Sequence, residues 1–170
     1  MKTLKVVVEK WNPRWKEEFL KIVDSLGDEI ILNSITIEHV GSTSVEGLSA
    51  KPIIDLDIVI RNDKFTLMKQ LLEERGYKYE GNLGIQGREA FSYNNKNDLM
   101  THHLYVCPQD SEELLRHITF RDYLRGHPAF ILEYSQVKEK AAALYPDDID
   151  KYMEYKSGCI EKGYKECGLL

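Results

Sequence analysis

IEHVGSTSVEGLSAKPIIDLDIVI, residues 37–60, holds two predicted β-strands and the turn that joins them. Residues 34–40 alternate apolar with polar side chains and are rich in β-branched residues, which predicts a strand ending at Gly41. We expect a short helix to begin at Gly41 and Ser42 and to end near Ala50. The second predicted strand, residues 52–60, carries Asp55 and Asp57 at alternate positions, so both carboxylates should lie on one face.

This turn and the two carboxylates together predict a phosphate site beside a metal site. Glycine lets the backbone approach a ligand closely, and a helix N-terminus offers free N–H groups to phosphate. Neighbouring carboxylates repel each other, and a hard cation such as Mg²⁺ (or Mn²⁺) relieves that repulsion while binding phosphate oxygens. We therefore expect Asp55 and Asp57 to bind the metal and Gly41 and Ser42 to hold phosphate. Lys51 is a further candidate for phosphate contact, with a plain surface charge as the alternative.

The rest of the chain predicts a mixed sheet with helices packed on it, an α/β (α+β) fold in one domain over residues 1–170. Apolar spacing indicates helices at residues 14–26 and 64–75. Three further strands are predicted at residues 77–80, 89–94 and 99–107. Three helices should follow, from Asp110 or Ser111 to about 125, from 128 to about 145, and from 147 or 148 toward 164.

Several motifs resemble those of known families. Gly-Ser, followed after about a dozen residues by Asp-x-Asp in an apolar strand, resembles the polymerase-β-type nucleotidyltransferase superfamily. The chain as a whole resembles the GrpB family. That resemblance rests on WNPRW at 11–15, residues 37–55, Gly87-Arg88, HLYV at 103–106, FRDYLRGHP at 120–128, and the helix with Tyr152 and Lys156.

The resemblance implies a nucleotidyltransferase-like fold with a C-terminal helical portion closing the cleft. It implies a metal-dependent nucleotidyltransferase whose partner is a nucleotide or another phosphorylated small molecule, with the acceptor open. A non-catalytic nucleotide- or phosphate-binding module of the same fold is the main alternative. A hydrolase that uses the metal to activate water is a third.

One departure from the superfamily concerns its usual third carboxylate, which stands on a later strand. The matching segment, residues 99–107, offers His103 and Tyr105 but no acid. Glu89 is the best substitute carboxylate. His103 is the best alternative, either as a ligand of a softer metal or as general base on the acceptor hydroxyl.

Basic residues could neutralise the remaining phosphate charge. His117, Arg121 and Arg125 are spaced by four and predict one helix stripe that holds an anion, unless the stripe is simply solvated. Arg88 could reach a phosphate or close a turn. Lys138 and Lys156 lie beside apolar helix faces, where they would either join the site or extend to water.

Composition limits the other functions. The chain has 23 Lys and Arg against 28 Asp and Glu, a net charge of −5, so general nucleic-acid binding is not expected. The three cysteines lack metal-finger spacing and fit reduced thiols. Neither a membrane span nor a signal peptide is evident, which predicts a cytoplasmic protein. The oligomeric state stays open.

Overall fold

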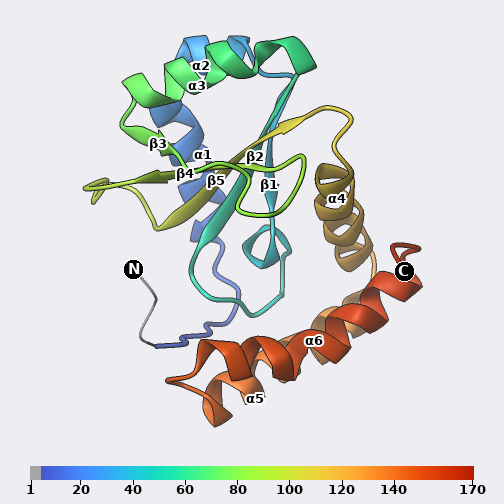
Figure 1. The fold of residues 1–170 in the computed structure, drawn as a ribbon. Helices are drawn as coiled ribbons and strands as arrows, with labels where there is room; N and C mark the ends of the chain where they lie inside the picture. The colour runs from blue at the N-terminus through green and yellow to red at the C-terminus, as the bar shows by residue number, and fades with distance from the viewer. Residues whose placement is uncertain (1–4) are drawn as a thin grey trace.

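The computed structural model describes residues 5–170 and contains one five-stranded mixed sheet, with strand order β1-β2-β5-β4-β3 (Figure 1). The strands are β1 (Thr36–Val40), β2 (Ile54–Ile60), β3 (Tyr77–Tyr79), β4 (Glu89–Tyr93) and β5 (His102–Pro108). The central pair, β2 and β5, is parallel, and all other neighbours are antiparallel. The mixed sheet expected from the sequence is thereby confirmed.

Within residues 5–170, six α-helices and two short 3₁₀ helices accompany the strands. The α-helices are α1 (Arg14–Leu26), α2 (Asp28–Leu32), α3 (Phe65–Glu74), α4 (Glu112–Arg125), α5 (Pro128–Leu144) and α6 (Ile149–Glu166). The 3₁₀ helices are η1 (Ser42–Ser44) and η2 (Asn62–Lys64). The predicted bounds of α1 are correct, and the predicted C-terminal helices match α4, α5 and α6 closely. The sequence analysis did not predict α2.

The helix expected from Gly41 to Ala50 is wrong, because only η1 forms there. Val45 already has an extended backbone (φ −111°, ψ 111°). Gly47 follows in the left-handed region at φ 89°. The turn therefore offers no α-helical N-terminus to an anion.

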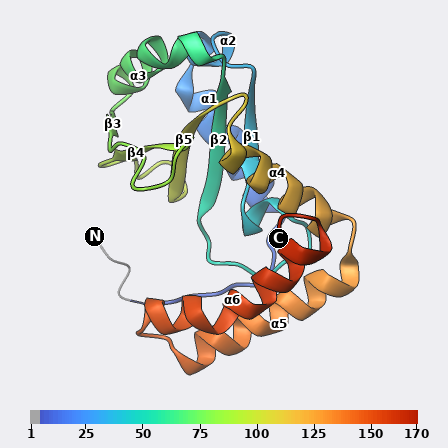
Figure 2. The same ribbon diagram turned by 45° about the vertical axis from the view of Figure 1, so that its right-hand side comes forward.

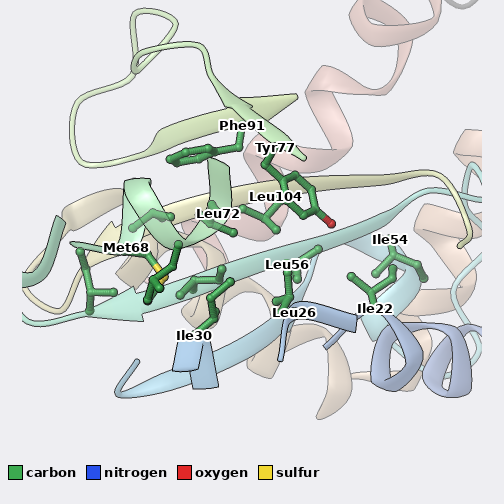
Figure 3. Packing of buried hydrophobic residues seen from close by; sticks show 14 of the residues in the cluster. Ile22, Leu26, Ile30, Ile54, Leu56, Met68, Leu72, Tyr77, Phe91 and Leu104 are labelled. Atoms are coloured by element: carbon green, nitrogen blue, oxygen red, sulfur yellow. The ribbon is translucent and has the colours of Figure 1, made fainter. Parts of the chain in front are cut away.

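One face of the sheet carries the main hydrophobic core. Ile54, Leu56, Ile58 and Ile60 alternate along β2 and are all fully buried. Figure 3 shows Leu56 between Leu104 of β5 and residues from α1, α2 and α3, such as Leu26, Ile30 and Met68. Burying one such side chain contributes about 2 kcal/mol, so this face fixes β2 and the direction in which its other side chains point.

The opposite face is covered only in part. Near one end of the sheet, Leu114 of α4 packs on Val59 and Cys107. Helices α5 and α6 form a pair that lies below the sheet, next to the turn after β1 (Figure 2). Phe130 and Tyr134 of α5 pack on Val45 and Leu48 of that segment. Between these two coverings, Asp55 of β2 borders a cavity, whereas Asp57 and Val59 on the same face are buried.

No helix within residues 5–170 combines the length and the apolar character needed to cross a membrane.

Candidate active site

Asp55 and Asp57 lie side by side on the face of β2 opposite the main core, as their spacing predicts. The Asp57 side chain is 0% exposed, whereas that of Asp55 is 29% exposed. Burial raises the pKa of Asp57, and His117 opposes that rise. Asp57 Oδ1 is buried without a hydrogen-bond partner in the described part of the chain. A buried carboxylate oxygen is costly to leave unpaired, so this atom marks a position suited to a bound cation or donor.

His117 of α4 contacts Asp57 across 60 positions of sequence. Its Nδ1 lies 2.6 Å from Asp57 Oδ2, and its Nε2 lies 3.2 Å from Glu113 Oε1. Burial alone would lower the pKa of His117, but the hydrogen bond and charge of Asp57, together with Glu113, raise it overall. The imidazole is thus fixed at both nitrogens. Sequence reasoning placed His117 only in an anion-binding stripe and missed its contact with the carboxylate pair.

His103 contacts Asp55 much as His117 contacts Asp57. The two residues are register partners in the parallel β2–β5 pair, and His103 Nδ1 lies 2.9 Å from Asp55 Oδ1. The side chain of His103 is 53% exposed, in contrast to that of the buried Asp57. This arrangement orients one imidazole nitrogen by a carboxylate, as in many general bases.

The turn after β1 depends on a glycine. Gly41 has φ 72°, and a Cβ at this position would collide with the Asp55 carboxylate. The hydroxyl of Ser44 donates to the Gly41 carbonyl, which closes the turn. Gly41 therefore lets the chain pass directly over Asp55 and brings Ser42 to the same side of the sheet.

Six of the predicted site residues line one cavity of about 170 Å³ beside this turn. They are Ser42, Lys51, Asp55, His103, Lys138 and Lys156. Lys138 extends from α5 and donates a hydrogen bond to Ser42 Oγ. Lys156 extends from α6, with its Nζ 4.9 Å from the Tyr152 ring centre. Neither lysine reaches out to bulk water, since Lys138 is 2% and Lys156 8% exposed.

Burial lowers the pKa of all three lysines, and neighbouring lysines add to this effect for Lys138 and Lys156. Burial, together with the charge of Lys51, lowers the pKa of Lys156 to about 8. Burial and the charges of Lys156 and Lys51 lower the pKa of Lys138 well below its usual range. Burial also lowers the pKa of Lys51. Packed cations of this kind favour a bound anion, because it offsets both their repulsion and their desolvation.

Arg88 lies beside Asp57 rather than in the lysine cavity. Its guanidinium sits 4.3 Å from the centre of the Tyr105 ring, and Tyr105 is the register partner of Asp57. The Arg88 Nε atom is buried with no hydrogen-bond partner within residues 5–170. A donor in this position is available to an oxygen of a ligand that reaches Asp57.

Arg121 and Arg125 do not line the lysine cavity, but Arg121 lines another cavity of about 170 Å³ together with Gly41, Ser42 and His117. A phosphate-binding role for these arginines stays a prediction. Arg121 Nη1 donates to Glu38 at 2.8 Å and to the His39 carbonyl at 3.1 Å. Arg125 Nη2 donates to the Ser44 carbonyl at 2.8 Å. Both arginines line a neighbouring cavity that shares only Thr43 with the lysine cavity.

Glu89 is wrong as a substitute third carboxylate. It pairs in register with Val106, and Val106 belongs to the main core on the other face of the sheet. Its carboxylate accepts a hydrogen bond from the Tyr79 hydroxyl at 2.7 Å. Strand alternation could have revealed this, because Glu89 shares its parity with the core residue Phe91.

The residues present fit a magnesium ion held by two carboxylates. Within residues 5–170, no three His, Cys, Asp or Glu side chains converge as a metal-binding group. Mg²⁺ commonly binds through one or two carboxylates and completes its shell with waters and phosphate oxygens. The buried, unpartnered Asp57 Oδ1 and the half-buried Asp55 supply such a pair.

The fold is similar to that of the Cid1 poly(U) polymerase. The structure of Cid1 in complex with its short product ApU aligns with a TM-score of 0.51 at 10% identity, over 76% of this chain and 40% of Cid1. The Cid1 poly(U) polymerase bound to MgGTP gives 0.51 at 11% identity, over 76% and 42%. At this level of identity the likeness concerns the fold alone.

The chain belongs to the GrpB family, as its motifs predict. The family model described as "GrpB protein" matches residues 5–166. The crystal structure of conserved protein GrpB from Enterococcus faecalis is 37% identical, with a TM-score of 0.81 over 95% of this chain and 96% of that one.

Two sequence relatives support the same assignment. UPF0157 protein YqkA of Bacillus subtilis is 37% identical over 92% of this chain, which spans only 46% of YqkA. Glutamate-rich protein GrpB of Alkalihalophilus pseudofirmus is 32% identical, over 92% of both chains.

Proposed function

We propose that this protein is a metal-dependent nucleotidyltransferase acting on a nucleotide or another phosphorylated compound. The observation that carries the proposal is the cavity that Lys51, Lys138 and Lys156 line together with Ser42 and Asp55. Three cations next to a carboxylate pair match a substrate that carries several phosphate charges and a divalent ion.

In this proposal each residue has a distinct task. Lys138 and Lys156 neutralise phosphate oxygens, and Ser42, held by Lys138, donates its own hydroxyl hydrogen to one of them. Asp55 and Asp57 would hold Mg²⁺ or Mn²⁺, which when bound stabilises charge on the phosphoryl group. His103, oriented by Asp55, accepts the proton of the attacking hydroxyl.

The lack of a third acid on β5 favours a second candidate function, a nucleotide-binding module without catalysis. On β5 the residues aligned with the carboxylate pair are His103 and Tyr105, so the strand offers no third acid. A two-metal site lacks a ligand in this arrangement. The module would keep the lysine cavity and bind nucleotide without turnover.

The deciding experiment measures binding and product release in parallel. The protein is incubated with Mg²⁺, each of the four ribonucleoside triphosphates and a low-molecular-mass metabolite extract as the source of acceptors. Release of pyrophosphate identifies transfer, release of inorganic phosphate identifies hydrolysis, and calorimetric binding without either identifies the module. Absence of both binding and turnover contradicts the proposal.

A double variant tests the metal ligands. Asp55→Asn with Asp57→Asn should abolish Mg²⁺ and Mn²⁺ binding in calorimetry while leaving the fold intact or more stable, because two neighbouring charges are removed. Asp63→Asn, at an exposed position in η2, serves as the control. Unchanged metal affinity in the double variant would exclude this pair as the metal site.

A further inference from the structure

A second, larger cavity lies on the other side of the turn after β1. Its volume is about 720 Å³, and it is bounded by the segment before α1, α1 itself, the edge strand β1, the turn and α4. It shares only Thr43 with the lysine cavity and contains neither Asp55 nor Asp57. Nothing in the proposed transfer reaction requires this space.

One wall of the second cavity is aromatic and firmly supported. Phe19 of α1 stacks on His39 of β1, with ring centres 4.6 Å apart and planes within 10°. Trp11, Phe19 and Ile37 are partly buried and pack against the main core. Rings held in this way keep their position without a ligand, so a flat group can stack on them at little entropic cost.

The opposite wall presents cationic groups. Arg125 makes its hydrogen bonds to the Ser44 carbonyl, and within residues 5–170 no carboxylate lies in ion-pair range of it. Arg121, by contrast, is already paired with Glu38 and Asp122. Arg125 thus has no carboxylate in ion-pair range among the described residues and keeps free donors at the cavity wall, although Asp122 and Glu38 lie near enough to favour its charge. Its guanidinium remains a suitable partner for phosphate or carboxylate.

We propose that this cavity binds a small molecule in which a flat aromatic or heteroaromatic ring is joined to an acid group, the class to which nucleoside monophosphates belong. The ring stacks against the Trp11–Phe19 wall, and the acid group pairs with Arg125. The site is separate from the lysine cavity, and its existence does not depend on the proposed transfer reaction. Because Thr43 borders both cavities and accepts or donates a hydrogen bond with His39 at 2.9 Å, a ligand here contacts the same turn that carries Ser42.

The chain supplies its own optical reporter for this site. It has two tryptophans, of which Trp15 is buried at 2% exposure and Trp11 lines the cavity. Titration with uridine monophosphate should therefore change tryptophan emission in a saturable way, with a dissociation constant of about 1 mM or lower. Uridine lacks the acid group and inorganic phosphate lacks the ring, so in the Trp11 fluorescence signal each should bind this cavity at least about tenfold more weakly.

Variants assign the binding to one cavity or the other. Arg125→Met should weaken uridine monophosphate at least about tenfold, whereas Arg61→Met, at an exposed position after β2, should not. Lys156→Met, which impairs the lysine cavity, should leave this affinity unchanged. Trp11→Phe should lose most of the fluorescence response, and calorimetry then measures the binding that remains.

Three results would overturn the proposal. They are the absence of saturable binding by both fluorescence and calorimetry, loss of binding in Lys156→Met with full binding in Arg125→Met, and equal affinity for inorganic phosphate and uridine monophosphate in the Trp11 fluorescence signal. Loss of binding in Lys156→Met alone would show that the ligand binds in the lysine cavity, which is compatible with the proposed transfer function. Emission from buried Trp15 checks that each variant is folded.

Discussion

Replacing Lys156 by methionine should stabilise the protein at neutral pH, although it removes a residue of the candidate active site. Lys156 is 8% exposed, and burial lowers its pKa from 10.5 to about 8. At about 1.4 kcal/mol per pKa unit, keeping this lysine charged in the folded state costs about 3 kcal/mol at pH 7. Methionine fills a similar volume without a charge.

The contact with Tyr152 reduces the expected gain. Lys156 Nζ lies 4.9 Å from the Tyr152 ring centre, and a cation–π interaction of this kind contributes about 1 kcal/mol. The two amounts leave a net stabilisation of about 2 kcal/mol at pH 7 for Lys156→Met. Helix propensity adds little, since lysine and methionine are nearly equivalent in a helix.

The effect should also depend on pH in a defined direction. The pKa of Lys156 in the folded protein, about 8, lies below its value of 10.5 in the unfolded chain. Between these values the unfolded state binds more protons, so the stability of the wild-type protein rises with pH. The advantage of Lys156→Met should therefore shrink between pH 8 and pH 10.5.

Urea denaturation in phosphate-free buffer measures both effects, because a bound anion would stabilise the wild-type protein selectively. Lys140→Met, at an exposed position in α5, is the matched control and should change stability little at either pH. A Lys156→Met variant less stable than wild type at pH 7, or a stability difference that does not vary with pH, would refute the reasoning.

Three further predictions concern the same site. The affinity for inorganic phosphate, measured by calorimetry, should fall by up to about tenfold per pH unit above the Lys156 pKa of about 8; a flat profile would contradict a role for this charge. Gly41→Ala should cost more than about 1 kcal/mol of stability, because its Cβ meets the adjacent carboxylate. Gly81→Ala, which has a similar φ of 77° and no atom within 4 Å, should cost less in the same urea titration, and equal costs would rule out the collision. His103→Asn should lower turnover once a substrate is found, whereas Glu89→Gln should leave turnover and metal preference unchanged. Lower turnover in Glu89→Gln with unchanged turnover in His103→Asn would instead make Glu89 the residue of the site.

The features that local patterns determine were predictable from the sequence. Alternation along β2 places Asp55 and Asp57 on one face because strand side chains alternate regardless of the surrounding fold. The bounds of α1 follow from its apolar spacing, Pro13 and the glycine at position 27. The same parity rule, applied to Glu89 and Phe91, would have excluded Glu89 from the catalytic face.

The features that depend on distant parts of the chain were not predictable in detail. The contact of His117 with Asp57 joins α4 to β2, and no local pattern encodes the rotation of a helix about its axis. The missing helix after Gly41 has a local origin as well. Residues 41–50 hold two glycines, three serines, Thr43 and Val45, which are weak helix formers, and Val45 and Leu48 pack on α5 from an irregular turn.

The lysine cavity gives the strongest physical reason to expect an anionic ligand. Lys51 comes from the loop before β2, Lys138 from α5 and Lys156 from α6, so three separate elements bring positive charge to one small space. A folded protein that lacks a ligand pays for this arrangement in stability, because burial and mutual repulsion both disfavour the charged amines. Asp55 is the carboxylate that lines the cavity with them, and a single negative charge does not balance three positive ones. A ligand with several phosphate charges would remove the imbalance and restore the usual lysine pKa values, so its binding should be accompanied by proton uptake at pH 8 and above.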